Sequence, residues 1–193
     1  MIRGLTKFAQ SDSEKGDNVP KTRVLLADGN PAMLDFISKM LADDCEVIGA
    51  VRDGRAILRE YPRLRPDVVL LSVQLGDLSG IEVAQQLRES GYDARIVFVT
   101  IEEDPEFVKS ALGAGASAYV VKARLTTDLL PAIRATMGDR LFVSPTLLEP
   151  CSLVTRNALP RILAEELEAG ERKPVQIVPL SPGAGRKRLH EKQ

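Results

Sequence analysis

The chain has 193 residues, of which 44% are hydrophobic and 27% charged, with a formal net charge of −1 at pH 7. This balance is typical of a globular protein, and it excludes a strong overall attraction to nucleic acid or to an anionic membrane. Two cysteines, no signal peptide and no run of 18 apolar residues predict a cytoplasmic protein without disulfides, metal-binding cysteines or a membrane span.

The first half of the chain changes from a patternless arm to an alternation of strands and helices. Residues 1–21 are polar and predict a disordered arm. Short apolar runs, typical of strands buried on both faces, occur in "RVLLA" (23–27), "CEVIGAV" (45–51) and "DVVLL" (67–71). Helical periodicity lies between them, at 31–44 and at 53–61, where we expect Pro62 to end the second helix.

The alternation continues to residue 138. A helix is predicted at 81–89, a strand at 94–100 and a helix at 104–116, for which Asp104 is the expected N-cap and Pro105 the first residue. "AYVV" (118–121) is the fifth strand, and the last helix is predicted at 127–138, with Thr127 or Asp128 near its cap.

Five strands that alternate with five helices predict a doubly wound α/β fold. For an open sheet of this size we expect the flavodoxin-like strand order 2-1-3-4-5. Polar residues follow four of the strands, and such sheets place functional groups at this edge. Each residue alone could be a cap, a loop contact or a surface charge, but together they indicate a site: Asp28, Ser72, Thr100 and Lys122.

Four segments carry a resemblance to a known family: "RVLLADGNP", "RPDVVLLSVQLGDLSGIEVAQQLR", "RIVFVT" and "ALGAGASAYVVKA". In this order and spacing they resemble the receiver domain of two-component response regulators, over about residues 23–138. The following "GDRLFVSP" is similar to the branch that usually carries a LuxR-type helix-turn-helix. The resemblance implies a phosphorylation switch, in which an acidic pair and a strand-three Asp bind Mg²⁺ and that Asp accepts the phosphoryl group.

Position by position, the resemblance implies that only part of this switch is present. Thr100 matches the hydroxyl after strand four, Tyr119 the aromatic residue of strand five, and Lys122 the lysine after strand five. Asp28 matches the first acid of the pair. Two carboxylates are replaced, however: Gly29 stands for the second acid, and Ser72 stands for the phosphoacceptor.

These replacements predict a receiver that has given up phosphotransfer. Mg²⁺ prefers several hard oxygen ligands, so one carboxylate predicts weak or absent binding, and we expect no cofactor. A neutral serine hydroxyl is a poor nucleophile without a base, and we expect no enzymatic activity. Lys122 is left with Asp28 as its main partner, and our hypothesis is a metal-free polar cluster of Asp28, Ser72, Thr100 and Lys122 that holds one conformation. Modification of Ser72 by a kinase remains a minor alternative.

Residues 139–193 predict an extension without a recognisable helix-turn-helix. One short acidic helix is expected at about 158–170, followed by a proline-rich stretch and a flexible basic tail, "GRKRLHEKQ". An acidic helix suits a phosphate backbone badly, and residues 23–138 carry a net charge of −4, so DNA binding is not expected.

The sequence therefore predicts a pseudo-receiver that acts as a phosphorylation-independent protein-interaction module. A sensor kinase, another response regulator or a second copy in a homodimer are the expected partners. The alternatives are a DNA-binding transcriptional regulator with a lost or unrecognised output domain, and a receiver still phosphorylated by unusual chemistry.

Overall fold

The computed structural model of the chain describes residues 20–147. Residues 1–19 of the predicted arm, the predicted helix at 158–170 and the basic tail lie outside the described residues. Among the residues that are described, no helix is long and apolar enough to cross a membrane.

The described residues form one parallel sheet of six strands in the order β2-β1-β3-β4-β5-β6. The predicted order of the first five strands is thereby confirmed. Each of these five strands is dominated by apolar residues that can be buried on both faces. The strands are β1 (Thr22–Ala27), β2 (Cys45–Val51), β3 (Val68–Leu71), β4 (Ile96–Thr100), β5 (Ala118–Val121) and β6 (Phe142–Val143).

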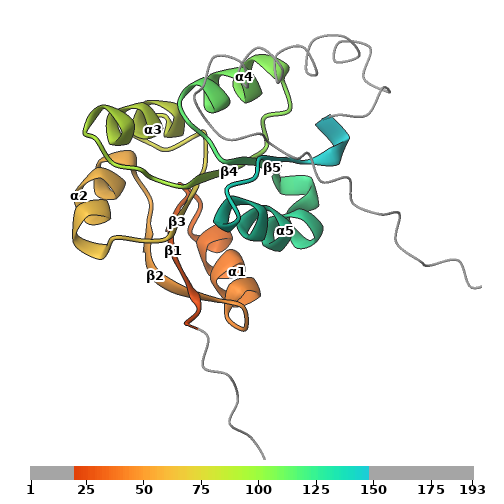
Figure 1. The fold of residues 1–193 in the computed structure, drawn as a ribbon, viewed down its shortest axis with the longest axis horizontal. Coiled ribbons are helices and arrows are strands. Elements are labelled where there is room, and N and C mark those ends of the chain that lie inside the picture. The colour runs from red at the N-terminus through yellow and green to blue at the C-terminus, as the bar shows by residue number, and fades with distance from the viewer. Residues whose placement is uncertain (1–19, 148–193) are drawn as a thin grey trace, which may run out of the picture.

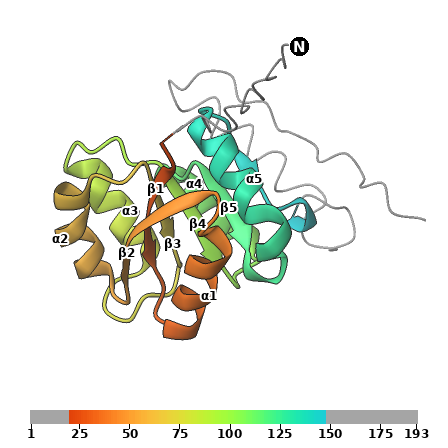
Figure 2. The ribbon, with the colours of Figure 1, turned by 90° about the horizontal axis from the view of Figure 1, so that it is seen from below.

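Five α-helices cover the two faces of the sheet, and Figures 1 and 2 show α2, α3 and α4 on one side with α1 and α5 on the other. This two-sided cover is what right-handed crossovers between parallel strands require. The helices are α1 (Pro31–Leu41), α2 (Gly54–Leu64), α3 (Gly80–Glu89), α4 (Pro105–Gly113) and α5 (Leu125–Met137), with short 3₁₀ turns η1 (Lys122–Arg124) and η2 (Pro145–Leu147).

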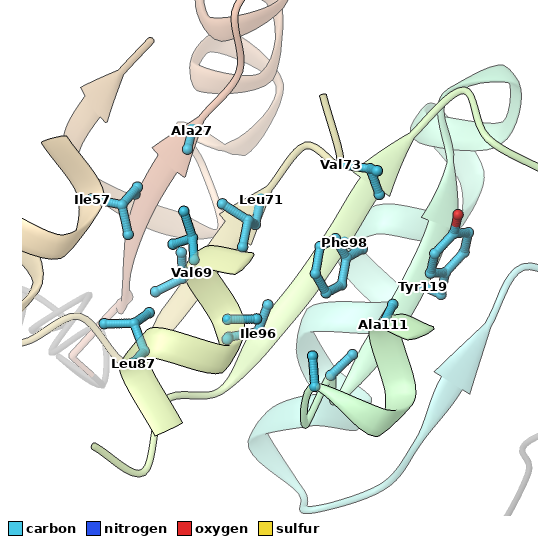
Figure 3. Packing of buried hydrophobic residues seen from close by; sticks show 14 of the residues in the cluster. Ala27, Ile57, Val69, Leu71, Val73, Leu87, Ile96, Phe98, Ala111 and Tyr119 are labelled. Atoms are coloured by element: carbon cyan, nitrogen blue, oxygen red, sulfur yellow. The ribbon is translucent and has the colours of Figure 1, made fainter. Parts of the chain in front are cut away.

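Two hydrophobic clusters hold the helices on the sheet, one on each face. Figure 3 shows the first, where Leu87 of α3 and Ala111 of α4 lie over Ile96 and Phe98 of β4. The second joins α1 and α5 to the opposite face. The sheet is thus packed on both faces, and the carboxyl ends of its strands lie side by side at one edge.

Helix α2 continues past Pro62, and the predicted end at that residue was wrong. Proline removes one N–H and clashes with the preceding turn, but here it lies in the last turn of the helix. The buried side chain of Tyr61 anchors this turn to the core. The helix ends instead at Arg65, which adopts a left-handed conformation (φ 45°) and donates its N–H to the Tyr61 carbonyl at 2.8 Å.

Helix α5 begins at Leu125, two residues before the predicted start, so that Asp128 lies in its first turn, where it is buried. The Asp128 carboxylate accepts hydrogen bonds from the hydroxyls of Thr127 and Ser144, each at 2.8 Å. Arg124 lies 3.0 Å from the same carboxylate. A buried charge is stable only with such partners, and these partners fix the start of α5.

Strand β6 was not predicted, since its two residues give no recognisable pattern. Val143 pairs with Tyr119 of β5 in parallel register, and the Ser144 N–H donates to the Tyr119 carbonyl at 2.9 Å. The Ser144 hydroxyl in turn accepts from the Val121 N–H at 3.1 Å. The folded unit therefore includes the residues that follow α5 as far as Leu147.

Candidate functional site

The four polar residues that follow the strands lie at the carboxyl edge of the sheet. The register of the parallel strands aligns Ala27 of β1 with Leu71 of β3, and Thr100 of β4 with Val121 of β5. Asp28, Ser72 and Lys122 follow directly after three of these strand ends. Asp28, Ser72 and Thr100 are buried, which is unusual for polar side chains and requires partners for their polar atoms.

Asp28 and Lys122, which follow the two strands of this group that lie furthest apart in the sheet, form an ion pair. The Lys122 ammonium lies 2.5 Å from Asp28 Oδ2, and the two side chains are 16% and 6% exposed. The other carboxylate oxygen, Oδ1, accepts the N–H of Asn30 at 2.9 Å. Both oxygens of Asp28 are thus engaged by the protein itself, and this is the pairing that we expected from the loss of the neighbouring acids.

Gly29 and Ser72 are uncharged, although the resemblance places carboxylates at both positions. A side-chain carbon placed on Gly29 would meet nothing nearer than the Gln74 carbonyl oxygen, at 3.9 Å, so there is room for an acid but none is present. The Ser72 N–H donates to the Ala27 carbonyl at 2.9 Å, which fixes its backbone. Its hydroxyl makes no hydrogen bond to any residue in the described range.

The residues at this edge do not fit Mg²⁺, the ion that the fold family implies. Such a site needs carboxylates with free oxygens to replace the ion's water. Among the four strand-end residues Asp28 is the only carboxylate, and it is occupied by an ammonium and a backbone N–H. Within residues 20–147 there is no group of three or more His, Cys, Asp or Glu side chains arranged to hold a metal ion.

Thr100 and Tyr119 belong to a second contact network, centred on Glu102. The Glu102 N–H donates to Thr100 Oγ1 at 3.2 Å, and the Tyr119 hydroxyl donates to the Glu102 carbonyl at 2.9 Å. The Gln74 amide, from the loop after β3, donates to the Glu102 carboxylate at 2.6 Å. The loop that leads into α4 is therefore attached at three points.

The Tyr119 ring is fully buried and lies beside Phe98, with ring centroids 6.2 Å apart (Figure 3). Burial raises the pKa of the Tyr119 hydroxyl, and the negative charge of Glu102 adds to this effect. Because the phenol stays protonated, it remains a hydrogen-bond donor to the Glu102 carbonyl.

In the structure the four residues do not form the single polar cluster of our hypothesis. Asp28 and Lys122 form a pair, Thr100 contacts its own loop, and the Ser72 hydroxyl joins neither. The sequence analysis did not anticipate the roles of Asn30, Gln74 and Glu102. Their contacts depend on loop conformations that leave no pattern in the residue types, and Glu102 belongs to an acidic run that is more simply interpreted as a solvated loop.

Asp77, in the loop after β3, has a different role from the one its position indicates. A polar residue in a loop just before a helix usually faces solvent or caps that helix. Its carboxylate instead accepts the N–H of Gly54, the first residue of α2, at 2.8 Å, and that of Leu78 at 2.9 Å. The cap of α3 is Ser79, which forms a reciprocal capping box with Glu82.

This arrangement is poorly suited to nucleophilic chemistry. A serine hydroxyl needs an adjacent base, and no histidine occurs in the described range. Asp28 follows the neighbouring strand β1, but both of its carboxylate oxygens already have partners, Lys122 and the Asn30 N–H. At this edge of the sheet, the described residues provide a buried ion pair and a loop that is anchored by hydrogen bonds.

Comparison with known proteins identifies the family. The family model described as "Response regulator receiver domain" matches residues 24–134. The chain belongs to the response regulator receiver family. A receiver domain of this family is a part of two-component signalling, which agrees with the fold and with the strand-end residues.

Its relatives include response regulators from several bacteria. The response regulator GacA of Pseudomonas viridiflava is 32% identical over 133 residues, which cover 68% of this chain and 62% of that protein. The uncharacterized transcriptional regulatory protein YxjL of Bacillus subtilis is 33% identical over 153 residues, which cover 78% and 70%. The chain therefore spans less than two thirds of the length of GacA.

Among solved structures, the chain is similar to a LuxR-family two-component response regulator from Aurantimonas sp. SI85-9A1. The TM-score is 0.64 at 26% identity, and the match covers 76% of this chain and 98% of that one. The similarity supports the same receiver fold.

Proposed function

We propose that this receiver signals without phosphorylation of the residue after β3 and acts as a protein-interaction module in the cytoplasm. The observation that carries the proposal is the buried pair of Asp28 and Lys122 in a pocket that has Gly29 and Ser72 in place of carboxylates. The pair neutralises itself, so neither a metal ion nor a phosphoryl group is needed to balance a cluster of buried charges.

The chemistry of phosphoryl transfer supports this proposal. The transferring group carries charge over its oxygens, and proteins neutralise that charge chiefly with Mg²⁺ and cationic side chains. In this chain the acids that would bring the ion are missing, and the cation Lys122 is already paired with Asp28. A serine ester formed at Ser72 would also need a base that the described residues do not provide.

The anchored loop before α4 supports a role in binding. Tyr119 and Gln74 both donate hydrogen bonds to Glu102, and these contacts favour the observed conformation of the loop. Ile101 and Phe107, which flank this loop, are 66% and 37% exposed. A partner protein such as a sensor kinase, another response regulator or a second copy of this chain would contact this side of the molecule, or α1 and α5.

Labelling with a small phosphodonor tests the proposal. The intact chain is incubated with acetyl phosphate and Mg²⁺, phosphate incorporation is measured by mass spectrometry, and Mg²⁺ binding is measured by calorimetry. We expect no stoichiometric label and no specific Mg²⁺ binding. Labelling of the wild-type chain at Ser72, or of any other residue at this edge, would overturn the proposal.

A rebuilt variant provides the positive control. Gly29→Asp with Ser72→Asp returns both acids, and the space beside Gly29 admits the first without a steric clash. The double variant should bind Mg²⁺ and take up phosphate, whereas Gly29→Asp alone should gain only the ion. A pull-down with the intact wild-type chain then identifies the partner.

DNA-binding regulation is a second candidate, and the relatives favour it. YxjL carries the description of a transcriptional regulatory protein, and its match extends over 78% of this chain. Residues 148–193 are the part of the chain that would contain an output function. A gel-shift assay at stated salt, with the intact chain and with a chain that ends at 171, tests this role, because only a DNA-binding extension would shift DNA in a manner that depends on residues 172–193.

A further inference from the structure

Residues 141–147, which we call the strap, lie along the outer edge of β5 (Figure 1). The strap contains β6 and the turn η2, and β6 pairs only with β5 among the described strands. The Phe142 N–H donates to the Ser117 carbonyl at 3.3 Å, and the Ser144 N–H donates to the Tyr119 carbonyl at 2.9 Å. Because a two-residue strand has few such bonds, the strap should open more readily than the strands inside the sheet.

A buried polar contact attaches the strap to helix α5. The Ser144 hydroxyl donates to Asp128 Oδ2 at 2.8 Å and accepts the Val121 N–H at 3.1 Å, so one side chain joins α5, β5 and β6. The side chains of Ser144 and Asp128 are both completely buried. The carboxylate has two further partners outside the strap, Thr127 and Arg124. Removing the Ser144 hydroxyl therefore does not leave Asp128 as an isolated buried charge.

The apolar residues of the strap belong to the hydrophobic core. Val143 and Leu147 are buried in the cluster that contains Tyr119, whereas Phe142 is buried in the cluster on the opposite face of the sheet. Val143 is also the register partner of Tyr119 across β5 and β6. The strap thus contributes to the packing of Tyr119, in addition to the hydrogen bond that the Tyr119 carbonyl accepts from Ser144.

Tyr119 connects the strap with the loop that leads into α4. Its main chain pairs with β6, and its hydroxyl donates to the Glu102 carbonyl at 2.9 Å. Glu102 also contacts Thr100 through its N–H and Gln74 through its carboxylate. The strap at the edge of the sheet and the loop at the carboxyl ends of the strands are therefore joined through the side chain of Tyr119.

We propose that the strap controls the conformation of residues 101–104 through Tyr119. With the strap in place, Tyr119 is buried and its hydroxyl holds the loop at Glu102. When the strap opens, Tyr119 loses packing and a main-chain hydrogen bond, and its contact with Glu102 weakens. A ligand or protein that favours the open strap must then also favour the loosened loop. This coupling needs no phosphoryl group, and it stands whether or not the loop contacts another protein.

Hydrogen exchange of the intact chain, read by mass spectrometry, tests the coupling. Ser144→Ala removes the contact with Asp128, and the amides of 142–144 should exchange roughly threefold to tenfold faster, the factor expected for one hydrogen bond. In the same variant the exchange of residues 101–104 should rise by about twofold or more. Thr146→Ala is the matched control, because it removes an exposed hydroxyl from the same strap, and it should change neither segment.

A second way of loosening the strap guards against an effect peculiar to Ser144. Leu147→Ala removes an apolar contact instead of a hydrogen bond, and it should accelerate exchange in both the strap and residues 101–104. The amides of β1, which is separated from β6 by three strands, show whether a variant is destabilised as a whole. The rates of the strap and of the loop are therefore read relative to those amides.

Tyr119→Phe distinguishes transmission through the Tyr119 hydroxyl from a general loosening of this side of the molecule. In the Tyr119→Phe background, Ser144→Ala should still accelerate the strap amides. It should no longer change the exchange of residues 101–104, because the contact that transmits the change is already absent. An effect on the loop that is as large in this background as in the wild type would overturn the proposed role of Tyr119.

The reverse experiment starts from the loop. Gln74→Ala removes the hydrogen bond to the Glu102 carboxylate, and because coupling between two sites is reciprocal, it should also accelerate the strap amides. A change confined to the loop would contradict the coupling. The proposal is overturned as well if Ser144→Ala and Leu147→Ala free the strap while residues 101–104 keep the wild-type exchange, or if neither variant frees the strap.

Discussion

The hydroxyl of Tyr119 donates a hydrogen bond of 2.9 Å to the main-chain carbonyl of Glu102. This contact joins a fully buried side chain of β5 to the loop that leads into α4. Because Glu102 also donates its N–H to Thr100, the loop is attached both to the strand before it and to the neighbouring strand. Its conformation is thus set by the core rather than by solvent.

Removing the Tyr119 hydroxyl should loosen this loop while leaving the core packed. Tyr119→Phe keeps the ring but leaves the Glu102 carbonyl without its donor, and a loss of about 1 kcal/mol is expected. Amide exchange of residues 101–104 should accelerate. Tyr92→Phe is the control, because Tyr92 is 40% exposed and its hydroxyl makes no hydrogen bond within the described range. Equal effects of the two substitutions would contradict the assigned role.

The same hydroxyl predicts how stability depends on alkaline pH. The pKa of Tyr119 is raised in the folded protein from an ordinary value of 10.0, chiefly by burial. Its contribution to stability is therefore complete below pH 10 and is lost as the pH rises above that value. The free energy of unfolding of the wild type should fall more steeply above pH 10 than that of Tyr119→Phe. Urea unfolding at pH 8 and pH 10.5 measures the difference.

The pair of Asp28 and Lys122 should show strong energetic coupling. Asp28→Asn or Lys122→Met alone leaves one buried charge without its partner, at an expected cost of about 3 kcal/mol. The double variant should lose less free energy of unfolding than the sum of the losses in the two single variants. The exposed pair Asp35 and Lys39, with a contact of 2.7 Å, is the matched control and should show coupling below about 0.5 kcal/mol. Additive losses at Asp28 and Lys122 would show that the pair has no coupling.

Gly80 should not tolerate a side chain. A Cβ atom built there would lie 2.1 Å from the carbonyl oxygen of Ser72, and that oxygen belongs to the backbone and cannot turn away. Gly80→Ala should destabilise the fold by about 1–3 kcal/mol or more. Gly76→Ala, four residues earlier, should change stability by less than about 1 kcal/mol, because a Cβ there meets nothing within 4 Å. Thermal unfolding of the two variants measures this contrast.

Asp77 should make a contribution to stability that disappears in acid. Slight burial alone would raise the pKa of its carboxyl, but hydrogen bonds from the main-chain N–H groups of Gly54 and Leu78 outweigh this and lower it below 3.8. The contribution is complete above pH 3.8 and is lost as the pH falls through the lower folded-state value. Asp77→Asn should therefore be less stable than the wild type at pH 7 and approach it near pH 3, as measured by urea unfolding. Asp43→Asn, at an exposed position where the side chain makes no hydrogen bond or ion pair in the described range, should show no such convergence.

The sheet and its order were predictable because buried parallel strands and helix caps leave local signals. Asp104 and Pro105 begin α4 as their types predict. Elements that depend on distant packing were not predictable. Helix α2 passes Pro62 because Tyr61 holds its last turn in the core, and β6 exists because β5 offers it a partner.

The candidate site, like the fold, was predictable in part. The strand-end residues follow from the alternation of strands and helices, and the pairing of Lys122 with Asp28 follows from the resemblance and its two missing carboxylates. The separation of Ser72 and Thr100 from that ion pair does not, because it depends on the conformation of the loops around Gln74 and Glu102. Side-chain contacts between two elements hold such a loop in place, and no single stretch of sequence predicts those contacts.

Strand β6 has a consequence for how this protein should be shortened. In the folded chain it covers the outer edge of β5 with hydrogen bonds that involve Tyr119 and Ser144. A fragment that stops at Gly138 would leave that edge open, and an open strand edge is a template for the same edge of another molecule. Such a fragment is expected to aggregate. Self-association measured with that fragment would be a result of the truncation. A fragment that stops after Leu147 keeps the edge closed.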